Sequence, residues 1–265
     1  MEIAGYAASV LIGLSLGLIG GGGSILTVPV MVYLFSVDAV LATTYSLFVV
    51  GATSLVGSIS YFKKNLLSLQ TAVIFGIPSV IAVFVTRTYI VPSIPSELLH
   101  SGNFIITKRV FLMALFALLM IFASYSMMRK RNIEPEENTK GKKWNYPALL
   151  IQGIFVGTIT GLIGAGGGFL IIPALENFLK LTMKTAVGTS LFIITINSLV
   201  GFLFSISHST IYWPLLLSVT AIAILGILAG SYLSTKIDGK KLKPAFGWFV
   251  LAMGLYILLK EISLP

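Results

Sequence analysis

The sequence contains no cysteine, which excludes disulfides, thiolate metal sites and thiol catalysis. Its two histidines, His100 and His208, lie far apart and have no metal-ligand spacing. We therefore expect neither a metal nor a cofactor. Charge is also scarce, since 10% of the 265 residues are charged and 56% are hydrophobic. A soluble globule is excluded because too little polar surface remains to cover it.

Instead the chain has long apolar runs separated by short polar segments. The runs cover residues 3–19, 24–36, 41–62, 69–91, 109–128, 147–163, 169–180, 186–206, 213–235 and 244–260. Several approach or exceed the roughly 18–20 residues with which a helix crosses the bilayer core. The net charge of +9 would suggest a nucleic-acid partner in a soluble protein, but here it reflects Lys and Arg in cytoplasmic loops. The sequence predicts an all-α polytopic membrane protein whose surroundings are lipid.

An internal repeat organises these runs. Residues 13–57 align without a gap onto 157–201, and 17 of the 45 pairs are identical, against about one tenth expected by chance. We expect repeat 1 at 1–128, a cytoplasmic linker at 129–146 and repeat 2 at 147–265. In each repeat, glycines split the first two runs into a re-entrant or broken hairpin, and three transmembrane helices follow.

The basic residues favour a returning hairpin over a broken helix that crosses once. A single crossing gives nine Lys and Arg to each side of the membrane, whereas returning hairpins give fourteen against four. The four on the outer side are Arg87, Lys108, Arg109 and Lys260. Only the second distribution fits the positive-inside rule. Each repeat then makes an odd number of crossings, which predicts an inverted-topology repeat with both termini outside. Segment 92–108 is expected to be an outer loop.

The glycine clusters are the sharpest candidate site. They comprise Gly20, Gly21, Gly22 and Gly23 with Ser24 in the first copy, and Gly164, Gly166, Gly167 and Gly168 in the second. A short helix is expected to begin after each cluster, near Ser24 and Phe169. Unpaired N–H groups at two such helix starts, brought together near mid-membrane, would bind an anion without a basic side chain. No Lys or Arg is expected well inside an apolar run. The alternative is that the glycines serve only packing and tip geometry.

Polar residues in the following runs are further candidates, each with a structural alternative. The hydroxyls of Ser46, Thr189 and Ser190 could donate to an oxyanion or merely bond a carbonyl one turn back. Asn197 could bind substrate or link two helices. Glu176 could relay protons or form an ordinary pair with Lys180. The pairs Gly13/Gly17, Gly157/Gly161 and Gly226/Gly230 are expected to be helix-packing faces.

These residues resemble those of the TauE/SafE family of sulfite and organosulfonate exporters. The likeness rests on the two glycine segments at 17–24 and 161–168, each followed by a proline, and on the stretch Ala186-Val-Gly-Thr-Ser190. The first copy departs there, with Ala42-Thr-Thr-Tyr-Ser46, so Ser46 is a matched position and Thr44 is not. The resemblance implies transport of small sulfur-containing anions, mostly outward, in the bacterial inner membrane.

The leading hypothesis is a secondary transporter that exports sulfite or small organosulfonates by alternating access around the midplane site. The alternative is a membrane-embedded assembly or maturation factor that binds a partner protein without solute flux. An enzyme is not expected, because no catalytic constellation is found. A homodimer, the coupling ion and the exact substrate stay open.

Overall fold

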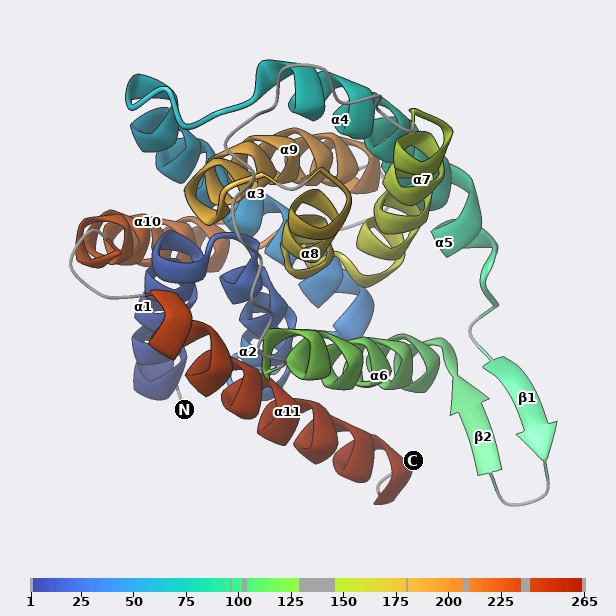
Figure 1. Cartoon of the computed structure of the whole chain (residues 1–265). Helices are drawn as coiled ribbons and strands as arrows, with labels where there is room; N and C mark the ends of the chain where they lie inside the picture. Colours follow the sequence, from blue (N-terminus) through green and yellow to red (C-terminus); the bar gives the residue numbers. More distant parts are fainter. Residues whose placement is uncertain are drawn as a thin grey trace.

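The computed structural model describes residues 2–95, 97–101, 104–128, 146–179, 181–206, 210–234 and 239–263, and it is built mainly from helices (Figure 1). Repeat 1 contains α1 (Glu2–Ile19), the 3-10 helix η1 (Gly21–Leu26), α2 (Thr27–Tyr33), α3 (Ala39–Lys63), α4 (Leu69–Val85), the π-helical turn η2 (Thr86–Ile90), α5 (Val91–Ser93) and α6 (Lys108–Met128). Repeat 2 contains α7 (Tyr146–Ile163), α8 (Gly168–Leu179), α9 (Met183–Ser205), α10 (Trp213–Leu233) and α11 (Gly239–Ser263).

The predicted helical membrane class is confirmed. Within the described residues, five helices are long and apolar enough to cross a membrane. They cover Ala39–Lys63, Leu69–Ser93, Lys108–Tyr125, Lys184–Ser205 and Trp213–Leu233. Large apolar side chains also point outward from the bundle, among them Phe122 at 76% exposure and Ile151 at 68%. Such a surface is stable in lipid and not in water.

The sequence predicted that segment 92–108 is an outer loop. In the structure, part of this segment forms strands. It contains an antiparallel hairpin of β1 (Glu97–Ser101) and β2 (Phe104–Thr107), with Glu97 opposite Thr107 and Ser101 opposite Phe104. The reason is local, because Phe104-Ile-Ile-Thr107 is a run of aromatic and β-branched residues that favours a strand. Figure 1 shows this hairpin projecting from the helical body between α5 and α6.

The first glycine-broken pair returns to where it started. A Cβ built on Gly5, near the start of α1, would lie 2.5 Å from Cζ of Phe35, which follows α2. The rings of Tyr6 and Phe35 meet edge to face with centroids 5.4 Å apart. At the other end, a Cβ on Gly23 would lie 2.4 Å from the backbone nitrogen of Leu16 in α1. The chain therefore folds back along α1 as a hairpin.

The two repeats pack crosswise. Helix α1 packs along α10 and α4 packs along α7, while α3 pairs with α9 and α6 pairs with α11. In the repeat, α1 corresponds to α7 and α4 corresponds to α10. The contact of α1 with α10 in one direction is therefore equivalent to the contact of α7 with α4 in the other. In Figure 1 the short helices α2 and α8 lie inside, with α3 and α9 on one side and α6 and α11 on the other. The pairing of helices between the two halves is thus the same in both directions.

Glycines allow the closest helix contacts in this arrangement. A Cβ on Gly13 of α1 would lie 2.0 Å from the carbonyl oxygen of Ala223 in α10. On the matching pair, a Cβ on Gly157 of α7 would lie 2.2 Å from the carbonyl oxygen of Ser79 in α4. Small residues bring membrane helices together by letting their backbones touch. The predicted packing faces are confirmed for Gly13/Gly17, Gly157/Gly161 and Gly226/Gly230.

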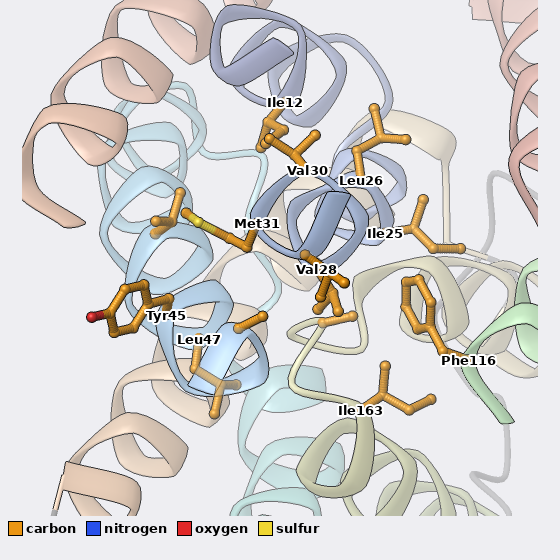
Figure 2. Close-up of a cluster of buried hydrophobic side chains, with 14 of the residues drawn as sticks. Ile12, Ile25, Leu26, Val28, Val30, Met31, Tyr45, Leu47, Phe116 and Ile163 are labelled. Atoms are coloured by element: carbon orange, nitrogen blue, oxygen red, sulfur yellow. The ribbon is translucent and has the colours of Figure 1, made fainter. Parts of the chain in front are cut away.

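The largest apolar cluster surrounds α2. Val28 and Met31 of this helix have no exposed surface. Figure 2 shows the side chains of η1 and α2 lying among residues of α1, α3, α6 and α7, with Ile12, Tyr45, Leu47, Phe116 and Ile163 labelled. The residues of α2 between Thr27 and Tyr33 are buried and apolar, as expected for a helix surrounded by protein. We call α1, η1 and α2 hairpin 1; its returning arm is fixed in the interior by side chains from both repeats.

Candidate functional site

The two glycine clusters touch each other. We call Gly20–Ser24 tip 1 and Gly164–Gly168 tip 2. A Cβ built on Gly21 would lie 2.2 Å from Cα of Gly168, and one built on Gly168 would lie 2.3 Å from Cα of Gly21. Only residues without side chains can approach this closely. Every residue of both tips is buried, so the structure brings the nine tip candidates together in the interior.

The tips share a backbone bend and then diverge. Gly20 and Gly164, which are aligned in the repeat, both have φ of +74°. In tip 2 this conformation continues, with φ of +67° at Gly166 and Gly167. An L residue in this region costs about 1–2 kcal/mol, so the bend itself requires glycine.

The short helices begin close to the predicted positions. α8 starts at Gly168, one residue before the predicted Phe169. In tip 1 the 3-10 helix η1 starts at Gly21, and α2 follows only at Thr27, so the expected helix start near Ser24 was wrong by three residues. The Ser24 hydroxyl donates to the carbonyl of Gly21 at 2.7 Å, which tightens the 3-10 turn.

Each tip contacts the opposite repeat as well as its own. A Cβ on Gly20 would lie 2.9 Å from Cγ1 of Val187 in α9, and a Cβ on Gly164 would lie 2.4 Å from the carbonyl oxygen of Thr43 in α3. Val187 and Thr43 are themselves aligned in the repeat. Each glycine bend is therefore clamped by the first turns of a long helix from the other half of the molecule.

Tip 2 presents unpaired backbone donors. In the described part of the chain, the N–H groups of Leu170 and Ile171 bond the carbonyl of Gly167 at 2.9 and 3.1 Å. The preceding N–H groups of Gly167, Gly168 and Phe169 have no such backbone acceptor among these residues. These groups carry the partial positive charge of the start of α8. They are suited to bind an anion.

The aligned serines Ser46 and Ser190 differ in their hydrogen bonds. Ser190 donates to the carbonyl of Val187 at 2.9 Å, which is the structural alternative raised for it. The hydroxyl of Ser46 is buried and has no hydrogen-bond partner. A buried hydroxyl without a partner is costly, so Ser46 is the stronger ligand candidate of the two.

Thr189 links the two repeats. Its Oγ1 accepts a hydrogen bond of 3.0 Å from the N–H of Ser68, the N-cap residue of α4. In the aligned position of repeat 1, the hydroxyl of Tyr45 accepts a 2.6 Å bond from the N–H of Tyr212, the N-cap residue of α10. The same crosswise tie thus occurs twice. Thr189 has a structural partner that sequence reasoning did not identify.

Asn197 also bonds across a helix interface. Its Nδ2 donates to Oγ of Ser79 in α4 at 2.7 Å, while its Oδ1 has no partner. The neighbouring Ser198 hydroxyl is likewise unpartnered and lies beside tip 2, 2.9 Å from a Cβ built on Gly166. Asn197 therefore ties two helices together and keeps a free acceptor. The side chain of Glu176, with Lys180, lies outside the described part of the structure, as does 129–145 of the predicted linker.

One cation beside tip 2 was missed by sequence reasoning. Arg87 was assigned to the outer side, and no Lys or Arg was expected well inside an apolar run. That expectation was wrong, since Arg87 is 3% exposed and its Nη2 lies 2.6 Å from a Cβ built on Gly164. The available signal was its position inside the run 69–91, with Tyr89 and Ile90 still to follow.

The fold and this interior site define a multi-pass membrane protein in which two glycine tips meet in the interior. The chain belongs to the sulfite exporter TauE/SafE family, whose model matches residues 6–257. The resemblance inferred from the glycine segments is thus confirmed, and with it a membrane transporter family and a multi-pass bacterial membrane location.

Individual relatives agree with this assignment. A probable membrane transporter protein of Xylella fastidiosa (strain 9a5c) is 29% identical over 253 residues, covering 94% of this chain and 91% of the relative. The probable membrane transporter protein YunE of Bacillus subtilis is 27% identical over 282 residues, covering 97% and 98%. A probable membrane transporter protein of Haemophilus influenzae is 24% identical, covering 94% and 95%. No solved structure matches the chain.

Proposed function

We propose that this protein exports small sulfur-containing anions, such as sulfite or organosulfonates, through a site between tip 1 and tip 2. The observation that carries the proposal is the contact of Gly21 with Gly168 in the interior, next to unpaired N–H groups at the start of α8. Broken helices whose N-termini meet in the membrane suit an anionic substrate. Ser46 and Asn197 would supply further polar groups.

The proposal includes an inverted repeat. Hairpin 1 returns to its starting side, so α3, α4 and α6 carry the chain across three times and repeat 2 starts from the opposite face. The crosswise packing of α1 with α10 and α4 with α7 fits this relation. Two inverted halves around one site would allow alternating access by exchange of their conformations.

Export needs no coupling ion in this scheme. An inside-negative potential favours the exit of an anion by about 2.3 kcal/mol per charge per 100 mV. The direct test is efflux from proteoliposomes that are loaded with labelled sulfite, sulfoacetate, taurine or sulfate under an imposed inside-negative potential. We expect at least one sulfur-containing anion to leave faster than from protein-free vesicles. Absence of flux for the whole panel would refute the proposed function.

The topology has its own test, because the natural chain has no cysteine. Single-cysteine variants at Lys64 and Lys240 should be protected together from an impermeant thiol reagent in intact cells, whereas Lys260→Cys should be labelled. Labelling of Lys64→Cys and Lys240→Cys on different faces would rule out the inverted arrangement.

A further inference from the structure

We propose that Arg87 binds the oxyanion group of the substrate at tip 2, as the fixed positive charge of the site. This inference rests on the proposed function and names the residue that would recognise a sulfonate or sulfite group. It begins from the hydrogen bonds of the guanidinium. Nη1 donates to Oγ1 of Thr43 at 3.1 Å, whereas Nε and Nη2 are buried without an acceptor.

No counter-ion of Arg87 is found among the described residues. In the part of the chain that the structure describes, the ion pair found joins Arg109 to Glu261, and none involves Arg87. Arg87 is 3% exposed, so its charge is also largely removed from solvent. An unpaired buried charge is strongly destabilising, so a fold that retains one benefits from an anion that binds there.

The position of Arg87 joins it to the proposed site. It lies on η2, the π-helical turn that interrupts the long helix through α4, and such turns frequently occur at functional sites. Its Nη2 lies against Gly164, where the absence of a side chain leaves the guanidinium in contact with the tip backbone. The N–H groups that start α8 follow in the same tip. Guanidinium and helix N-terminus thus present donors from two directions.

The oxyanion class follows from the donor geometry. Nε and Nη2 are the two donors on one edge of the guanidinium, and that edge matches two oxygens of a sulfonate, sulfite or carboxylate group. The unpartnered hydroxyl of Thr160, which lies 1.9 Å from a Cβ built on Gly167, adds a neutral donor at tip 2.

Repeat 1 alone carries this charge. The position that corresponds to Arg87 in repeat 2 is Ser231, whose hydroxyl is exposed and bonds the carbonyl of Leu228 at 3.1 Å. Val187 contacts Gly20 in tip 1, and the aligned residue Thr43 contacts Gly164 in tip 2. Tip 1 is therefore flanked by an apolar side chain and tip 2 by a cation. The site has one end for the charged group and one for the remainder of the substrate.

The test compares Arg87→Met and Arg87→Lys with wild type and with Arg109→Gln, a control arginine that is 54% exposed. Purified full-length protein is melted in detergent with and without sulfite and sulfoacetate, and efflux is measured in proteoliposomes. We expect these anions to raise the melting temperature of wild type and Arg109→Gln but not of Arg87→Met. Arg87→Met should lose about tenfold or more of the flux, and Arg87→Lys should retain an intermediate part.

A separate readout distinguishes binding from a structural role. Without ligand, Arg87→Met should melt at or above the wild-type temperature, because an unpaired buried charge has been removed. A much lower melting temperature would mean that Arg87 serves the fold, and would overturn the inference. Full anion stabilisation and flux in Arg87→Met would overturn it as well. If wild type itself shows neither flux nor anion stabilisation, the proposed function fails first and this inference with it.

Discussion

Replacing Gly168 by alanine tests whether the contact between the tips is the site. The added Cβ would lie 2.3 Å from Cα of Gly21, about 1.1 Å short of the 3.4 Å at which ordinary contact begins. The Cβ is fixed to its backbone and Cα of Gly21 is a backbone atom, so no side chain can rotate away. The two tips must therefore separate by roughly 1 Å.

Two opposing terms set the size of the effect on stability. Alanine in place of glycine near a helix start favours the helix by up to about 1 kcal/mol. Overpacking in the interior costs about 1–3 kcal/mol. The net loss of folding free energy is therefore about 0–3 kcal/mol, and the variant should still fold. Transport should suffer far more, since a displacement of about 1 Å in positioned groups can cost up to a hundredfold in rate.

The assay is anion efflux from proteoliposomes, normalised to inserted protein, together with the melting temperature in detergent. Gly76→Ala in α4 is the matched control, because a Cβ there would lie 3.9 Å from its nearest neighbouring atom, Cγ1 of Ile193. We expect Gly168→Ala to lose at least tenfold of the flux and Gly76→Ala to keep it. Flux within twofold of wild type in Gly168→Ala would refute a site between the tips. Equal loss in both variants would show that any added methyl group is harmful.

Two further predictions use aligned positions. Ser46→Ala should lower anion flux, because the hydroxyl that it removes has no partner and is free to donate. Ser190→Ala should leave flux nearly unchanged, because the Ser190 hydroxyl already bonds its own helix. A similar loss of efflux in both variants would contradict this assignment. Tyr45→Phe removes the acceptor of the Tyr212 N–H and should lower folding stability by about 1 kcal/mol in a denaturation series. An unchanged midpoint would mean that this crosswise tie contributes nothing to stability.

Much of the fold could be predicted because the bilayer limits the choices. The length of each apolar run decides which segments can span the membrane. The internal repeat predicts that corresponding segments of the two halves have the same local structure. Glycine spacing at Gly13 and Gly157 gave the packing faces, since close helix contact needs small residues. The strands at 97–101 and 104–107 were missed because their apolar run is only a few residues long.

The site was predictable in its backbone and not in its side chains. The glycine clusters predict a bend in the backbone, and the bends at Gly20 and Gly164 have the same φ. Ser46 and Ser190 look alike in sequence, but only the packed side-chain conformation decides that Ser190 bonds a carbonyl of its own helix while Ser46 has no partner. Arg87 was missed because position in an apolar run says how far along a helix a charge lies, but not what surrounds it.

The repeat conserves geometry where the chemistry differs. The bend of each tip and the crosswise ties of Tyr45 and Thr189 occur in both halves. The cation does not, since Arg87 corresponds to Ser231. A transporter with two related halves can open its site to either side of the membrane in equivalent ways. A substrate with one charged end, however, needs a binding pocket that holds it in one orientation. We infer that the halves supply the exchange of access and that Arg87, present once, sets the orientation in which an anion lies between the tips.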